Sequence, residues 1–250
     1  NWIHSYKINP SNSKNVVQLG TDIQVSPNLE NDAHPSIALD GDGNPFIVYD
    51  HETEDLYTDL YFQRSFDRGA TWPEDQIFFI SSDEISPIKP PFDIPSDGTR
   101  GLGTFQNDLP DTTLYFIDAV NLDDISTWLI YSFTIDTEYL GGSAIGVYES
   151  ELGVLARISD VTGSDGNTYL EHCVVMWAPL DSETWTGVFW TYEAPMSKPD
   201  VATGGDRMYA ACEVNDVDNT WILTMYAPHD TIDYTGWSGS RIVRGTSNLT

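Results

Sequence analysis

Short runs in which apolar and polar residues alternate recur along most of the chain, whereas the helical periodicity of about 3.6 residues is hard to find. The runs are rich in Val, Ile, Tyr, Phe, Trp and Thr, and clusters of Gly, Asp, Asn and Pro separate them, as is typical of strands joined by turns. The clearest predicted strands are Ser36 to Leu39, Pro45 to Tyr49, Leu60 to Arg64, Gln76 to Ile80, Thr113 to Val120, Trp128 to Ile135, Val154 to Ile158, Cys173 to Trp177, Met208 to Val214 and Trp221 to Tyr226. The pattern predicts an all-β protein, which is a sandwich, a barrel or a propeller.

A faint internal repeat favours the propeller. His34 to Ala38 leads through the turn Asp40 to Asn44 into an apolar run, and Lys198 to Ala202 leads through Gly204 to Asp206 into another. With two weaker openings between them, the repeat units start near residues 35, 88, 145 and 199, and each has room for the roughly 40 to 50 residues of a propeller blade together with longer loops. We therefore expect residues 31–250 to form one domain of about four full, four-stranded antiparallel blades.

Residues 1–30 are predicted to add an outer half-blade, because they resemble the last two strands of a blade without the inner pair. Two alternatives follow: these strands close a small ring, or the chain is part of a longer propeller. An open set of blades exposes edge strands that invite a partner, including a second copy of the chain.

The charge balance narrows the class of partner. The chain has 11 Lys and Arg against 39 Asp and Glu, a formal net charge of −28. Such a surface disfavours nucleic acid and anionic membranes, both of which need clustered basic residues. It suits high salt, divalent cations or an extracellular setting. No apolar stretch approaches the roughly 18 residues of a membrane span, and the start at Asn1 suggests a processed or excised chain. We expect an extracellular or cell-surface location.

The sequence allows two kinds of covalent modification, a disulfide and an N-linked glycan. Cys173 and Cys212 lie in separate strand-like runs without a metal-ligand spacing, so they are either two buried thiols or one disulfide between neighbouring sheets. Asn248, in Asn248-Leu249-Thr250, is the one candidate for N-glycosylation, since Pro10 disqualifies the earlier sequon-like string.

The strongest local motif is an octapeptide between two predicted strands. Ser65-Phe66-Asp67-Arg68-Gly69-Ala70-Thr71-Trp72 fits the Asp-box pattern, defined here by Ser65, Asp67, Gly69, Thr71 and Trp72. The motif predicts a tight turn in which the Asp carboxylate accepts backbone N–H groups and the Gly takes a positive φ. On this motif the chain resembles the sialidase-like propeller superfamily with bacterial-neuraminidase-type repeats, most specifically over residues 33 to 82. The resemblance implies a fold, because the Asp box is structural in that superfamily.

The sialidase catalytic motif is absent. The resemblance would imply an Arg-Ile-Pro string, and the nearest string here has Asp93 before Ile94-Pro95. A three-arginine carboxylate clamp would have to use Arg100, Arg157 and Arg207, since the other arginines belong to the Asp-box hairpin or the last outer strand.

Other candidate sites are suggested only by the types of residues present and their spacing. Asp40, Asp42 and Asn44 have oxygen ligands at alternate positions and form the candidate calcium site; the alternative is a plain hairpin turn. Glu149 with Glu151, or Asp123 with Asp124, would be carboxylate pairs for glycoside hydrolysis, but solvated turns are the favoured explanation for each pair.

These observations predict a non-catalytic extracellular or cell-surface propeller module for protein binding, glycan binding or surface assembly. The alternative is a glycoside hydrolase with a central acidic pocket.

Overall fold

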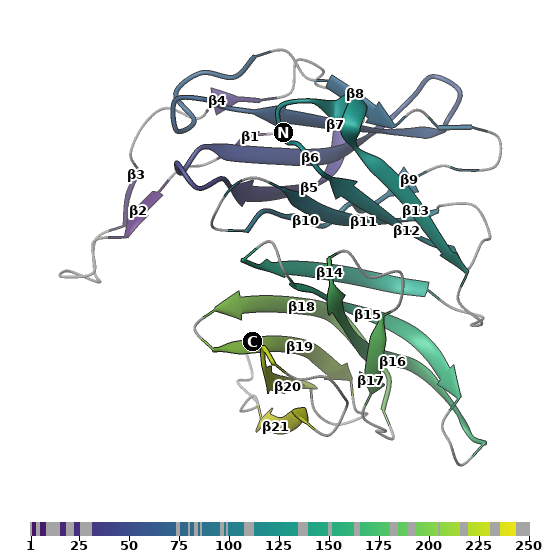
Figure 1. The fold of residues 1–250 in the computed structure, drawn as a ribbon. Coiled ribbons are helices and arrows are strands. Elements are labelled where there is room, and N and C mark those ends of the chain that lie inside the picture. Colours follow the sequence, from purple (N-terminus) through teal and green to yellow (C-terminus); the bar gives the residue numbers. More distant parts are fainter. Residues whose placement is uncertain are drawn as a thin grey trace, which may run out of the picture.

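The computed structural model describes most of the chain (Figure 1). The described residues are 2–3, 6–8, 16–18, 23–25, 32–73, 76–79, 81–82, 85, 87–95, 98, 100–107, 113–134, 140–149, 152–162, 166–180, 185–189, 194–204, 206–215, 220–230 and 236–243.

Strands that follow one another in the sequence pair into antiparallel sheets, which we number as blades. Blade 1 contains β5 (Asp32–Leu39), β6 (Pro45–Glu52), β7 (Thr58–Arg64) and β8 (Gln76–Phe79). Blade 2 contains β9 (Pro87–Ile88), β10 (Phe92–Asp93), β11 (Gly101–Asn107), β12 (Thr113–Ala119) and β13 (Leu129–Thr134), with the short 3-10 helix η1 (Ile125–Thr127) before β13. Blade 3 contains β14 (Leu140–Tyr148), β15 (Leu152–Thr162), β16 (Thr168–Pro179) and β17 (Thr186–Phe189). Blade 4 contains β18 (Met196–Gly204), β19 (Arg207–Asn215), β20 (Thr220–Pro228) and β21 (Ser238–Val243).

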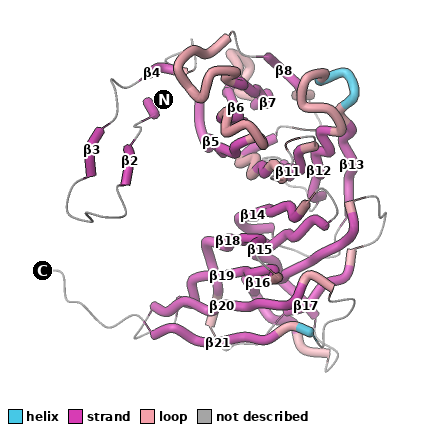
Figure 2. Tube along the Cα trace, turned by 60° about the vertical axis from the view of Figure 1, so that its left-hand side comes forward, coloured by secondary structure: helices cyan, strands magenta, loops and turns pink. Residues whose placement is uncertain are grey.

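The predicted all-β propeller of four-stranded blades is confirmed. Strands β9 and β10 both pair with β11, so they are two segments of one interrupted inner strand. Figure 2 shows the four blades stacked along an arc, with blades 1 and 4 at its ends. Inner strands of successive blades contact one another, from β5 through β10 and β14 to β18.

Two short ribbons precede blade 1. Strand β1 (Trp2–Ile3) pairs with β4 (Ile23–Gln24), and β2 (Tyr6–Ile8) pairs with β3 (Val16–Gln18). Val25, just after β4, packs against Ile47 and Tyr49 of β6. Val25 therefore covers part of the face of blade 1 that points away from blade 2.

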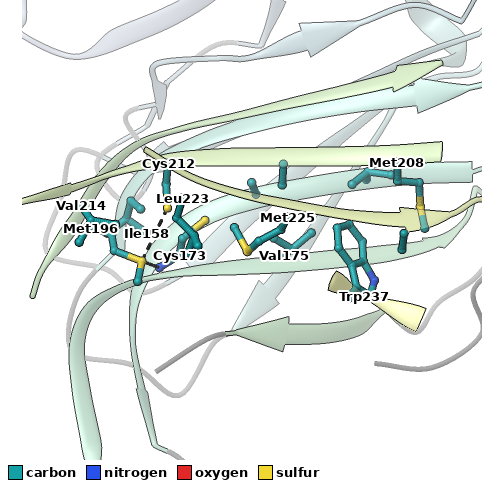
Figure 3. Close-up of a cluster of buried hydrophobic side chains, with 14 of the residues drawn as sticks. Ile158, Cys173, Val175, Met196, Met208, Cys212, Val214, Leu223, Met225 and Trp237 are labelled. Carbon is teal, nitrogen blue, oxygen red and sulfur yellow. Dashed lines mark hydrogen bonds between the residues drawn. The ribbon is translucent and has the colours of Figure 1, made fainter. Parts of the chain in front are cut away.

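The hydrophobic core lies between blades, because alternate residues of each strand face opposite neighbours. One cluster joins blades 1 and 2 and includes Phe46, Phe62, Phe92 and Phe105. Another joins blades 2 and 3 through residues such as Leu114 and Leu155. The largest joins blades 3 and 4, where Val175, Met208, Met225 and Trp237 interdigitate (Figure 3). Stacking of adjacent sheets therefore stabilises the arc.

Candidate functional site

In each blade, the innermost strand pairs irregularly with the second strand at one point in the first half of the innermost strand. The register shifts between Ala33 and Ser36 in blade 1, between Leu140 and Ser143 in blade 3, and between Ser197 and Asp200 in blade 4. In blade 2, Ile88 pairs with Gln106 and Phe92 with Gly103, so the inner strand gains a residue there. Such β-bulges bend a strand and redirect its side chains, and they are frequent beside active sites.

Three of the four bulges carry a basic residue in a left-handed backbone conformation. His34, Lys89 and Lys198 have φ values of 45°, 52° and 50°, and a proline follows each. Positive φ is uncommon for residues other than glycine, and a following proline restricts the backbone further. Each such conformation costs on the order of 1–3 kcal/mol, which the surrounding structure must offset. We call His34, Lys89 and Lys198 the basic bulge residues.

The bulge of blade 1 is held by a buried carboxylate. His34 Nδ1 lies 2.8 Å from Asp50 Oδ2, and the Asp50 side chain is only 3% exposed. The Lys89 backbone N–H donates to the same oxygen, also at 2.8 Å. Asp50 therefore links the bulges of blades 1 and 2. When Nδ1–H is donated to Asp50, the Nε2 atom of the neutral imidazole is left as an acceptor, and 46% of the His34 side chain is exposed.

Blade 4 repeats this arrangement on a more open surface. Lys198 Nζ lies 2.8 Å from Glu213 Oε2, with the Lys198 side chain 80% exposed. Glu213 pairs with the residue just before its bulge, as Asp50 does in blade 1. Beside Asp50, His51 Nδ1 bonds Asp32 Oδ1 at 2.6 Å. The bulged ends of the inner strands thus present acid–base pairs in blades 1 and 4, with the exposed Lys89 in blade 2.

The Asp-box turn lies at the other end of blade 1. The Ser65 backbone N–H donates to Pro45 O at 3.0 Å, which places the turn at the start of β6, whereas Asp50 lies five residues further along. At about 3.3 Å per residue the separation is about 17 Å. The turn is therefore remote from the basic bulge residues.

Hydrogen bonds within the motif explain its residue pattern. Asp67 accepts from the backbone N–H and the hydroxyl of Thr71, each at 2.7 Å, and these bonds with that from Ser65 lower the pKa of Asp67. Gly69 has φ 88°, and its N–H donates to Ser65 Oγ at 2.8 Å. Trp72 packs on the cluster formed by Val25, Ile47 and Tyr49. All five motif residues thus have structural contacts.

The candidate calcium turn is built around Asp40. Asp40 Oδ1 accepts from the backbone N–H groups of Asp42 and Asn44, and Oδ2 accepts from the Asn44 amide and from Arg64 Nη2 at 2.8 Å. Burial by itself would raise the pKa of Asp40, but the bonds from Arg64, Asn44 and Asp42 lower it overall. The guanidinium of Arg64 already balances this carboxylate. Over the described part of the chain, no cluster of three or more His, Cys, Asp or Glu side chains is arranged to hold a metal ion.

Asp93 connects blades 2 and 3. Its Oδ2 accepts from the Val147 backbone N–H at 2.9 Å, and burial raises its pKa above the usual value of 3.8 although hydrogen bonds from Val147 and Ile94 oppose the shift. A Cβ built on Gly146 would lie 3.2 Å from Val201 Cγ2, 3.5 Å from Thr203 Cγ2 and 3.8 Å from Asp93 Oδ2. The inner strands of blades 2, 3 and 4 are therefore closely packed here.

The three arginines named for a carboxylate clamp do not meet. Arg100 forms two 2.7 Å bonds to Asp118 and one to Leu180 O, so it lies near the start of β15. Arg207 stands at the β18–β19 turn over the Tyr226 ring. Arg157 is five residues along β15 from Leu152, about 17 Å away, and burial lowers its pKa to about 10. Its Nε and Nη1 atoms are buried without a hydrogen-bond partner.

The structure does not bring the remaining candidate residues together into one site. Asp123 pairs with Arg64, and Asp124 accepts from Ser126 N at the start of η1, so both have structural partners. Glu149 lies in a turn, whereas Glu151 and the glycosylation candidate Asn248 fall outside the described residues. Cys173 and Cys212 are buried free thiols.

The sequence pattern identified His34 and Lys198 only as the starts of repeats and missed Asp50, Lys89 and Glu213. A signal was present, because a basic residue precedes proline at His34-Pro35, Lys89-Pro90 and Lys198-Pro199. Their carboxylate partners lie on other strands, so spacing alone could not identify them.

Solved structures of other proteins resemble this chain in fold, although no sequence comparison finds a match. No protein family and no curated protein sequence matches the chain. Similar solved structures include an unknown function protein from Dyadobacter fermentans (TM-score 0.60, 14% identity, covering 88% of this chain and 71% of that one), a Penicillium chrysogenum alpha-L-arabinanase complexed with arabinobiose (0.58, 14%, 87% and 68%) and the Hadza microbial sialidase Hz136 (0.53, 15%, 78% and 44%). The chain spans less than half the length of the sialidase. These similarities confirm the predicted propeller fold, which this chain shares with the sialidase and the arabinanase. Within the described ranges, no helix is long and apolar enough to cross a membrane.

Proposed function

We propose that this chain is a non-catalytic glycan-binding propeller module, exposed outside the cell, whose ligand site is formed by the bulged ends of the inner strands. The observation that carries the proposal is the repeated placement of basic residues at strained bulges in three different blades. Two of the chain's four lysines stand at this position. In so acidic a chain, turns and strand surfaces otherwise carry mostly carboxylates.

The chemistry of the site suits hydroxyl-rich ligands. Lys89 and Lys198 supply ammonium donors, the Nε2 atom of His34 supplies an acceptor, and Glu213 supplies acceptor oxygens. Hydrogen bonds to charged groups contribute about 1.5–3 kcal/mol each, more than neutral ones. Donors and acceptors held on rigid strands also lose little entropy when a ligand binds.

The fold comparison supports the same ligand class. The arabinanase structure holds arabinobiose, and the sialidase is likewise named for action on sugars. The net charge of −28 supports an extracellular setting for this chain.

The test is a glycan array followed by calorimetry on the best ligand, in calcium and again in chelator. We expect the Lys89→Ala and Lys198→Ala variants each to weaken binding by roughly tenfold or more, from the loss of one charge-assisted bond. Arg207→Ala is the matched control for Lys198→Ala, since Arg207 stands at the other end of the same β18–β19 hairpin. Unchanged binding in both lysine variants, or equal loss in the control, would contradict this site.

A glycoside hydrolase is the second candidate, and the raised pKa of Asp93 on an inner strand favours it. A carboxyl group with a raised pKa can act as a general acid in glycoside hydrolysis. The check is release of reducing sugar from whichever glycan the array identifies. Hydrolysis that the Asp93→Asn variant abolishes, without loss of binding, would establish the hydrolase and reject the non-catalytic module.

Self-assembly is a further candidate, favoured by the outer face of blade 4. Tyr209 and Ile222 are exposed there on neighbouring strands, 43% and 39% respectively. Sedimentation velocity over a concentration series tests it: a dimer that Ile222→Lys abolishes supports pairing through this face, whereas a monomer at all concentrations rejects it.

A further inference from the structure

The only two cysteines of the chain meet across the boundary between blades 3 and 4. Cys173 lies on β16 and Cys212 on β19, and both side chains belong to the buried cluster between these blades, where they lie beside each other (Figure 3). Both approach Met196 of β18, since Cys212 Sγ lies 3.6 Å from Met196 Sδ and the Cys173 N–H donates to that sulfur at 3.2 Å (Figure 3). The two residues are 1% and 2% exposed.

We propose that Cys173 and Cys212 form a disulfide that covalently joins blades 3 and 4 when the protein folds in an oxidising environment. A disulfide needs an S–S separation of about 2.05 Å and Cβ atoms about 3.5–4.5 Å apart. The cysteines belong to different sheets, so a relative shift of the two blades can bring the neighbouring thiols to bonding distance without breaking either sheet's ladder. The proposal does not depend on the glycan site.

The oxidant we name is glutathione disulfide. A thiolate from one cysteine attacks it to give a mixed disulfide and releases one glutathione thiolate, and the second cysteine then displaces the other. The new Sγ–Sγ bond replaces the S–S bond of the oxidant. The two cysteines lose two protons and two electrons, which leave as two molecules of reduced glutathione.

Burial determines when this reaction occurs. The adjacent Cys212 side chain, together with desolvation, raises the pKa of the Cys173 thiol. Thiolate is the reactive form, so the raised pKa makes Cys173 less reactive in the folded reduced protein, and the burial of both thiols keeps the oxidant out of the core between the blades. The disulfide therefore forms during folding, before blades 3 and 4 pack together, and is protected from reductants afterwards.

The experiment refolds the whole chain from denaturant in a glutathione redox buffer and, in parallel, with reductant alone. Unreacted thiols are alkylated after denaturation, and the products are digested with trypsin. Trypsin cuts after Arg157, Arg207 and Arg241 and not before Pro199, so residues 158–207 and 208–241 form separate peptides, each with one cysteine.

We expect the redox-refolded protein to be lighter by two hydrogen atoms and to yield these two peptides linked. Its melting temperature should exceed that of the reduced protein by roughly 5–15 °C, from closure of a loop of about 40 residues. Oxidation of already folded reduced protein should be slower than oxidation during refolding by more than about tenfold.

Cys173→Ala and Cys212→Ala are the control variants, and neither should yield the linked pair. Two alkylatable thiols after redox refolding, glutathione adducts, or a linkage between two chains on a non-reducing gel would each overturn the proposal. The comparison of oxidised with reduced wild-type protein does not depend on whether either variant folds.

Discussion

His34 and Lys198 occupy equivalent positions in the first and last blades. Each precedes a proline in a bulge with positive φ, and each lies 2.8 Å from a carboxylate on the second strand of its blade. The two pairs differ in their surroundings. Asp50 is enclosed between blades 1 and 2 and takes a second bond from Lys89, whereas Glu213 belongs to the open face of blade 4. We therefore expect the same local geometry to contribute more to the free energy of unfolding in blade 1 than in blade 4.

Replacing Asp50 with Asn tests this difference. The variant loses the charge of a buried carboxylate that His34 Nδ1 and the Lys89 N–H share. We expect the free energy of unfolding to fall by about 1–3 kcal/mol. The equivalent change Glu213→Gln breaks an ion pair whose lysine is exposed and should cost less than about 1 kcal/mol. Urea denaturation of both variants measures the contrast, and equal losses would contradict it.

Asp93 makes stability depend on pH in a defined direction. Burial raises its pKa above 3.8, so the folded state binds this proton more tightly than the unfolded chain does. Its contribution to stability is fully present below pH 3.8 and is lost as the pH rises through the folded-state pKa. We expect Asp93→Asn to be more stable than the wild type at pH 7, by a margin that shrinks toward pH 3.8. Urea denaturation at several pH values across this range measures the difference in stability between the variant and the wild type. A difference that grew on acidification would contradict a raised pKa for Asp93.

Gly146 allows three inner strands to approach closely. A methyl group there would lie 3.2 Å from Val201 Cγ2 and 3.5 Å from Thr203 Cγ2, with Asp93 on a third side. We expect Gly146→Ala to lower the free energy of unfolding by about 1 kcal/mol or more, as overpacked sites do. Gly204→Ala is the control, because a Cβ at Gly204 meets no heavy atom within 4 Å. Thermal melting of both variants decides the question, and a Gly146→Ala protein as stable as the control would show that the strands can separate freely.

Arg157 is a buried cation whose Nε and Nη1 atoms have no hydrogen-bond partner. Replacing a buried charge by an apolar side chain of similar volume is often neutral or stabilising by about 1–4 kcal/mol. We expect Arg157→Met to unfold at equal or higher urea concentration than the wild type. A loss of stability above about 2 kcal/mol would instead mean that an anion compensates this guanidinium in solution.

Chelation of calcium should leave the melting temperature unchanged. Arg64 already neutralises Asp40, and both oxygens of that carboxylate accept hydrogen bonds within the turn. Calorimetry with and without chelator measures this. A fall in melting temperature that Asp42→Asn also produces would support the calcium site predicted for this turn.

Strand identity and the propeller fold were predictable from the sequence because their causes are local. Short apolar runs rich in strand-forming residues identify β6, β19 and β20, and the turn residues between Leu39 and Pro45 act within a few positions of one another. The Asp-box motif was recognisable for the same reason. All of its hydrogen bonds between Ser65 and Thr71 are contained in one hairpin turn.

Only the tertiary structure decided which of these residues meet. The shared bond of His34 and Lys89 to Asp50, the bond of Asp93 to Val147, and the contacts that Cys173 and Cys212 both make with Met196 all cross from one strand or blade to another. Periodicity records which face of a strand a residue occupies, but not which residue of the neighbouring sheet lies opposite. That depends on how the bulges shift the register and how closely the blades pack, and both result from the summed packing of whole sheets. The sequence by itself therefore determined the strands, the turns and the repeat, whereas docking of the blades determined the candidate site.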